Sequence, residues 1–110
     1  MNLVLDGSVQ LCYCPEIMDE YERVLAYEKL NIDQETQKEV IEDLKKIGES
    51  VVPVDSNVEF GNDPSDKVFY DTAITRDAIL ITGNMKHFTH VPHSGRVMTP
   101  AEFLQVHLKP

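Results

Sequence analysis

Two polar features near the middle of the chain combine residue types that can bind a ligand or a metal ion. Asp66 lies in the first turn of a predicted helix, and a small polar turn of Thr82, Gly83 and Asn84 follows a predicted strand. In open α/β sheets, ligands bind outside the carboxyl ends of the strands. We therefore expect Asp66 and the polar turn to share one ligand-binding edge of a sheet.

A helix and a strand must position these two features. The helix is predicted over residues 63–76, with Asp63 as its N-cap and Pro64 as its first helical residue. Residues 78–81, with the sequence Ala-Ile-Leu-Ile, form an apolar run without alternation. Such a run is typical of a strand that is covered on both faces, as in a parallel sheet between layers of helices.

The remaining elements complete an α/β pattern. Residues 2–6 precede Gly7 and are interpreted as the last turn of a helix with a glycine C-cap. Further strands are predicted over residues 8–14, 51–54 (at a sheet edge) and 96–98, and further helices from Pro15, over about 33–48, and from Thr99 onward. This order indicates an α/β fold with a mostly parallel sheet, in a single domain of residues 1–110.

The segments that carry these features resemble a known family. The sequences DPSDKVFYDTA, ILITGNMKHF and VMTPAEFL follow one another in the order and spacing of the C-terminal half of a PIN domain. The resemblance is closest to the PIN-domain toxins of toxin–antitoxin systems, and it extends back through residues 15–25. It covers nearly all of the chain and implies a three-layer α/β/α fold.

The resemblance implies a metal-dependent endoribonuclease. PIN domains hold Mg²⁺ or Mn²⁺ with acids at the carboxyl edge of the sheet, where the metal neutralises a phosphate oxygen and lowers the pKa of a bound water. By resemblance, the metal ligands are Glu20 and Asp66, and Asn84 stands where the family often has a further catalytic acid. Asp63 and Thr82 fall beside these residues and are candidates for supporting them.

One part of the family's pattern is missing from this sequence. The first acid of the family lies in a motif of the type Asp-Thr-Asn, at the end of a strand in the middle of the sheet, and the chain has neither the strand nor the motif. Asp6 is not a substitute, because it is expected at the end of a helix. We therefore expect an N-terminally truncated domain that lacks about 25–30 residues, judged against the usual size of a βα unit.

Two functional hypotheses follow. The first is a Mg²⁺-dependent endoribonuclease toxin, with RNA as its substrate and an antitoxin protein as its partner. The second is a truncated, catalytically inactive PIN remnant that acts as a dimerisation or partner-binding module. The absence of a central strand would leave strand edges that favour a homodimer by edge pairing or swapping.

Each candidate residue also has a purely structural interpretation. An acid at the position of Asp66 favours the positive end of a helix dipole, and Glu20 fits a solvated helix face. Asp63 suits an N-cap better than a metal ligand, and both Thr82 and Asn84 suit a tight turn. The sequence alone leaves these alternatives open.

Basic and histidine residues near the candidate edge are weaker signals. Lys67 and Lys86 could contact phosphate, although surface lysines are the simpler interpretation. His87, His90 and His93 have a spacing that invites a zinc site, but it fits one face of a helix poorly. By resemblance, His87 belongs to the turn that follows the late strand of a PIN domain.

Composition limits the partners and the location of the protein. The chain has 110 residues, with 10 basic and 19 acidic side chains and a net charge of −9. This charge argues against tight RNA binding, but it is compatible with acids that hold a metal ion and with a basic partner. We expect a cytoplasmic protein, because the sequence shows no signal peptide and no apolar run near the ~20 residues of a membrane span.

The two cysteines are two residues apart on a predicted strand. Cys12 and Cys14 would therefore point to the same face of that strand. We interpret them as reduced, partly buried thiols, because a metal or redox site would usually need further cysteines.

Overall fold

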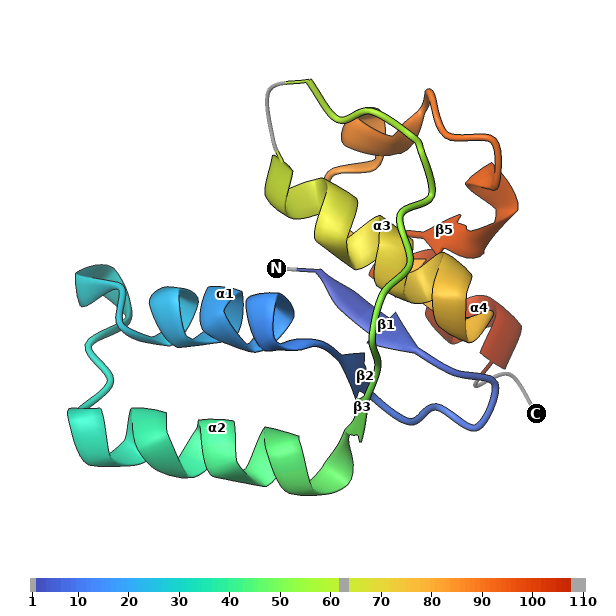
Figure 1. Ribbon diagram of the computed structural model, residues 1–110. Coiled ribbons are helices and arrows are strands. Elements are labelled where there is room, and N and C mark those ends of the chain that lie inside the picture. Colours follow the sequence, from blue (N-terminus) through green and yellow to red (C-terminus); the bar gives the residue numbers. More distant parts are fainter. Residues whose placement is uncertain (1, 62–63, 108–110) are drawn as a thin grey trace.

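The computed structural model describes residues 2–61 and 64–107. Its strands are short, and its three longest helices precede β4 in the chain (Figure 1). The strands are β1 (Leu3–Leu5), β2 (Cys12–Tyr13), β3 (Glu49–Ser50), β4 (Ile79–Ile81) and β5 (Val97–Met98). The α-helices are α1 (Pro15–Leu25), α2 (Gln34–Ile47), α3 (Pro64–Arg76) and α4 (Pro100–His107). Single 3-10 turns are η1 (Glu28–Leu30), η2 (Met85–Phe88) and η3 (Ser94–Arg96).

The strands form a mixed sheet in two parts. β1 pairs antiparallel with β4, β4 pairs parallel with β5, and β2 pairs parallel with β3. One antiparallel bridge between Leu5 and Leu11 links β1 to the start of β2. The described strands therefore follow the spatial order β3, β2, β1, β4, β5, and β1 runs opposite to the other four. A mostly parallel sheet is therefore not confirmed, because β1, in the middle of this order, runs antiparallel to both of its neighbours.

The prediction of a helical turn over residues 2–6 was wrong. Residues 3–5 form β1, with Val4 paired to Leu80 and both side chains fully buried. Periodicity cannot distinguish a strand from a helix in so short an apolar run. Pairing with β4 decides the conformation, because β4 offers the backbone groups of β1 their hydrogen-bond partners.

Two other predicted strands differ from the structure. The strand over residues 8–14 is reduced to β2, and the edge strand over residues 51–54 is absent from the described structure, which has β3 at Glu49–Ser50 instead. Val52 and Val54 are 85% and 68% exposed, and the Val54 N–H donates to Thr75 Oγ1 at 2.9 Å rather than to a strand. Pro53 lacks an N–H for a ladder, which explains why the pairing ends there.

Helix α3 is the central helix of the domain. It packs against β1, β2 and β4, and its buried residues lie on several sides rather than on one stripe. By contrast, α1 and α2 lie beside each other with their outer faces exposed (Figure 1). A residue in the first turn of α3 is therefore held in place by the core of the protein.

Several local predictions are confirmed. Thr99 and Glu102 form the predicted capping box at the start of α4, with reciprocal hydrogen bonds of 3.0 and 3.1 Å. Cys12 and Cys14 are both buried, unbridged thiols. Asp63, the predicted N-cap of α3, lies outside the described residues. None of the described helices combines the length and the apolar character that crossing a membrane requires.

The centre of the sheet gives a direct test of this arrangement. Leu80→Ala should lower the free energy of unfolding by about 2–5 kcal/mol, because Leu80 is fully buried between Val4 and Val97. Val52→Ala is the matched control and should change it little, since that side chain is 85% exposed. Urea denaturation measures both values. Equal effects of the two substitutions would contradict the placement of β4 in the core.

Candidate functional site

Asp66 is a buried carboxylate at the start of α3. It is 6% exposed and lies in the first turn of the helix. The side-chain amide of Asn2 donates to Asp66 Oδ1 at 3.3 Å, and His87 Nδ1 lies 3.0 Å from Asp66 Oδ2. Three distant segments thus converge on one carboxylate: the start of β1, the first turn of α3 and the turn after β4.

The turn after β4 is built around Thr82. Thr82 is fully buried, and its hydroxyl accepts a hydrogen bond from the Asn84 N–H at 3.0 Å. The Asn84 carbonyl in turn accepts from the His87 N–H at 2.9 Å. These bonds fix the path of the chain from the end of β4 to η2. Thr82 therefore has the turn-capping role that was one of its two interpretations.

Asn84 lies at the same edge as Asp66, and the contact between them is indirect. Asn84 is exposed and caps η2, whose residue His87 contacts Asp66. The predicted shared edge of Asp66 and residues 82–84 thus exists, with His87 as the connecting side chain. The sequence pattern places His87 in the family's turn, or less well in a zinc site, and it does not predict this contact with Asp66.

Glu20 lies on α1, beside the first turn of α3. It lines a pocket with Arg23 of its own helix and with Pro64, Ser65 and Val68 of α3. Its carboxylate forms an ion pair with Arg23, and its side chain is 29% exposed. Glu20 is therefore near the segment that carries Asp66, but its carboxylate pairs with a cation on its own helix.

Two of the other basic and histidine candidates, Lys67 and His90, have structural partners. Lys67 pairs with Asp55 at 2.7 Å and with Asp71 at 3.0 Å. His90 Nε2 lies 2.8 Å from the Glu59 carbonyl, away from the partner of His87. These contacts support the structural interpretation of Lys67 and show that His87 and His90 have separate partners.

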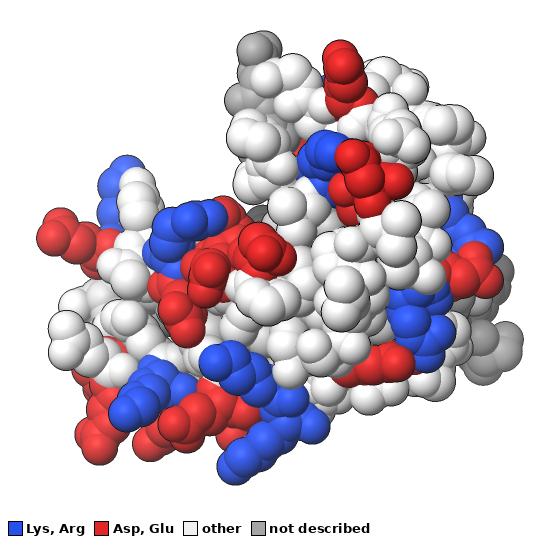
Figure 2. Space-filling model, in the orientation of Figure 1, with Lys and Arg blue, Asp and Glu red and all other residues white. Residues whose placement is uncertain are grey.

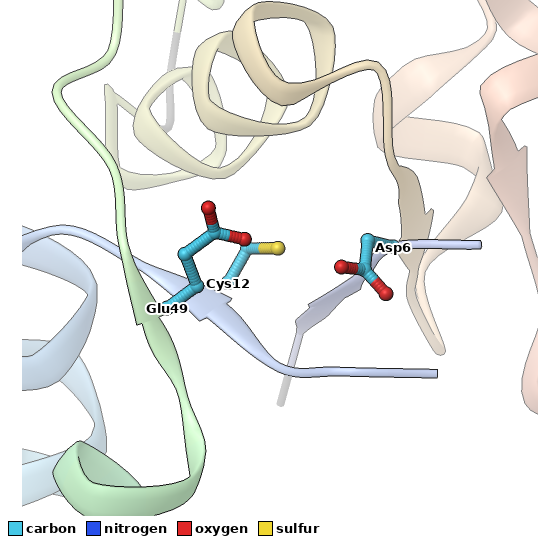
Figure 3. Close-up of side chains that lie close together, drawn as sticks. All are labelled: Asp6, Cys12 and Glu49. Carbon is cyan, nitrogen blue, oxygen red and sulfur yellow. The ribbon is translucent and has the colours of Figure 1, made fainter. Parts of the chain in front are cut away.

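A second group of polar side chains lies at the opposite edge of the sheet. Asp6, Cys12 and Glu49 each place one potential ligand atom within 4.8 Å of the other two. Figure 3 shows Cys12 and Glu49 side by side on β2 and β3, with Asp6 facing them from the end of β1. No local sequence pattern predicts this group, because its members meet only through strand pairing. No such group of three among the described residues includes Asp66 or Glu20.

Arg76 gives this second group a structural explanation. Its guanidinium contacts Glu49 Oε2 at 2.8 Å and Asp6 Oδ2 at 3.5 Å, so a cation already faces the two acids. Burial raises the pKa of the Cys12 thiol, and the charges of Asp6 and Glu49 raise it further. Because the thiolate is the form that binds metals, this thiol is a poor ligand.

Comparison with known protein families adds an independent observation. A family model described as PIN domain matches residues 1–86. The chain belongs to the PIN domain family. Comparisons with curated proteins and with solved structures gave no match.

Membership of the PIN domain family assigns an α/β fold and a general nuclease-type function. PIN domains are generally dependent on divalent metal ions and act on nucleic acids. The expected toxin branch and the expected truncation stay predictions.

The contribution of Asp6 to the stability of this PIN domain, at the edge opposite Asp66, should depend on pH. The Ser8 hydroxyl, followed by the N–H groups of Gln10 and Ser8 and the charge of Arg76, holds the pKa of Asp6 below its ordinary value of 3.8. A depressed pKa contributes stability that is present above the unfolded pKa and is lost as the pH falls through the folded pKa. Asp6→Asn should therefore be destabilising at pH 7, and the difference from the wild type should shrink toward pH 3.

Urea midpoints at several pH values measure this difference. Asp19→Asn, on the exposed face of α1, is the control for the loss of one negative charge. A difference between wild type and Asp6→Asn that stays constant or widens on acidification would contradict the role of Asp6.

Proposed function

We propose that this PIN domain is a Mg²⁺- or Mn²⁺-dependent endoribonuclease and the toxin component of a toxin–antitoxin system. The observation that carries the proposal is the buried carboxylate of Asp66, held at the carboxyl edge of the sheet by Asn2 and His87. In this proposal the domain spans the whole chain, is cytoplasmic and takes an antitoxin protein as its partner.

The donor set of this edge suits a hard divalent cation. Asp66 and Glu20 supply carboxylate oxygens and Asn84 supplies an amide oxygen, which are the ligand types that Mg²⁺ prefers. A carboxylate offers about four lone-pair sites, so hydrogen bonds from Asn2 and His87 are compatible with metal binding by Asp66. Mg²⁺ usually keeps several waters and is held by one or two carboxylates, so a small number of protein ligands suffices.

In this site each residue has a distinct task. A bound metal ion would neutralise a phosphate oxygen and lower the pKa of a water. Asp66 would hold the metal from a rigid helix end, and Glu20 would complete the oxygen ligands after exchanging Arg23 for the metal. Asn84, exposed at the start of η2, would orient the phosphate or a metal-bound water.

Charge distribution favours weak, metal-screened contact with RNA. Figure 2 shows acidic and basic side chains interspersed on the visible face, without a continuous basic stripe. With a net charge of −9, the protein repels a polyanion at long range. The same charge attracts a basic protein, which agrees with control by a basic antitoxin segment.

A second candidate is a catalytically inactive PIN module that binds a partner or forms a homodimer. The ion pair between Glu20 and Arg23 favours it, because a metal must displace Arg23 from one of the two expected carboxylate ligands. The exposed apolar residues Val52 and Val54, next to the edge strand β3, would be the dimer contact. Sedimentation at several concentrations tests for the dimer.

Cleavage of single-stranded RNA tests the enzymatic proposal. Wild-type protein should cleave in the presence of Mg²⁺ and stop when EDTA is added. Asp66→Asn should reduce cleavage more than about 100-fold, because losing a metal ligand should exceed the 10–100-fold cost of losing an outer-shell partner. Asp71→Asn is the matched control, since Asp71 is an equally buried acid of α3 that pairs with Lys67.

The outcomes separate the two candidates. Loss of cleavage in Asp66→Asn with retention in Asp71→Asn supports the nuclease. Cleavage that continues unchanged in Asp66→Asn would remove Asp66 from the active site. An inactive wild-type protein that neither binds Mn²⁺ nor cleaves RNA would favour the partner-binding module.

A further inference from the structure

The side chains of His87 and Asp66 lie within hydrogen-bond distance of each other. His87 Nδ1 lies 3.0 Å from Asp66 Oδ2. When Asp66 is ionised, its carboxylate only accepts hydrogen bonds, so Nδ1 is then the donor. The acceptor is a side chain with 9% exposure, and the donor ring has 38% exposure. A buried carboxylate thus receives a bond from a ring that reaches in from the protein surface.

The position of the ring is fixed by its own segment. Phe88, the next residue, is 2% exposed and packs edge-on against Phe60, with ring centroids 5.5 Å apart. The His87 N–H is bonded to the Asn84 carbonyl at 2.9 Å. The backbone on both sides of the imidazole is therefore anchored, and the ring approaches Asp66 from one defined direction.

The second contact of Asp66 is fixed in a similar way. Asn2 donates to Oδ1 through its side chain, while its backbone carbonyl accepts from the buried Tyr21 hydroxyl at 2.9 Å. His87 and Asn2 thus contact different oxygens of one carboxylate from different elements. Together they restrict rotation of the carboxylate about its terminal bond, which is otherwise a broad torsion.

We propose that His87 is a positioning residue that orients the Asp66 carboxylate for a divalent metal ion. The inference rests on the proposed metal-dependent function, and it assigns to His87 a role that the turn sequence alone does not specify. Hydrogen bonds to a ligating carboxylate fix its orientation, and their removal typically costs 10–100-fold in metal affinity or activity. His87 does not contact the reacting atoms in this account.

A purely stabilising role would give a different result. If the His87–Asp66 contact served only to tie η2 to α3, its loss would lower the melting temperature and leave the intrinsic metal affinity of the folded protein unchanged. Metal affinity, measured on folded protein without RNA, therefore separates the two roles. It also avoids any dependence on catalytic turnover.

The experiment is a titration of the full chain with Mn²⁺ alone, with free Mn²⁺ measured by electron paramagnetic resonance. The variants are His87→Ala, which removes the donor, and His87→Asn, whose amide nitrogen occupies nearly the place of Nδ1. His93→Ala is the matched control, because it removes an exposed histidine from the same region of the chain. Asp66→Asn defines the binding that depends on the site.

We expect His87→Ala to weaken the Asp66-dependent binding of Mn²⁺ by about 10-fold or more. His87→Asn should recover most of the lost affinity, and His93→Ala should bind as the wild type does. Thermal melts show in each case that the protein measured is folded. Should His87→Ala fail to fold, the comparison of His87→Asn with His87→Leu replaces it.

Three results would overturn the proposal. Equal Mn²⁺ affinity in wild type and His87→Ala, with Asp66-dependent binding present, would remove the positioning role and leave the proposed nuclease intact. An equal loss in His87→Ala and His87→Asn would show that the ring fills space rather than donating a bond. The absence of Asp66-dependent binding in the wild type would instead remove the metal site itself, and with it both proposals.

Discussion

The antiparallel pairing of β1 with β4 is the constraint on which the rest of the structure depends. Val4 and Leu80 face each other at its centre, and both are fully buried. Because β1 also bridges to Leu11, it joins the β2–β3 pair to the β4–β5 pair. Without this strand the two parts of the sheet would have no described ladder between them.

The same pairing sends the two ends of β1 to opposite edges of the sheet. Its start brings Asn2 to the carboxyl end of β4, where Asp66 and the Thr82 turn lie. Its end brings Asp6 to the other edge, beside Cys12 and Glu49. The three paired residues of β1 thus separate the polar contacts of Asp66 from the group of Asp6, Cys12 and Glu49.

These two centres differ in how their charges are compensated. Asp6 faces the guanidinium of Arg76, which also binds Glu49 and so supplies a fixed cation. Asp66 contacts the amide of Asn2 and the imidazole of His87, which can donate hydrogen bonds without a fixed positive charge. A carboxylate has further lone-pair sites beyond these two contacts, which is compatible with the proposed metal site at Asp66.

The sequence predicted the elements that have strong local signals. Helix α3, strand β4 and the turn of Thr82 and Asn84 could be placed because Pro64, the apolar run and the small polar residues each have a local conformational preference. The shared edge of Asp66 and residues 82–84 followed from general sheet geometry. β1 could not be predicted, because three apolar residues carry no periodicity and only their partner strand decides their conformation.

The contacts that complete the site could not be read from local patterns. Asn2 and His87 are separated from Asp66 by 64 and 21 residues, so no spacing rule connects them. The group of Asp6, Cys12 and Glu49 depends on a strand register that the sequence does not reveal. The pairing of Glu20 with Arg23 is different, since its i,i+3 spacing on a predicted helix was a usable signal for an intrahelical ion pair.

We propose that the carboxyl edge of the sheet, and not the opposite edge, binds the divalent metal ion. The most direct measurement is the broadening of backbone amide NMR signals by substoichiometric Mn²⁺. We predict that broadening begins at Asn2, Asp66 and residues 82–87 and spares Asp6, Cys12 and Glu49. Broadening centred on Asp6, Cys12 and Glu49, with the signals of Asp66 and His87 unchanged, would contradict the account.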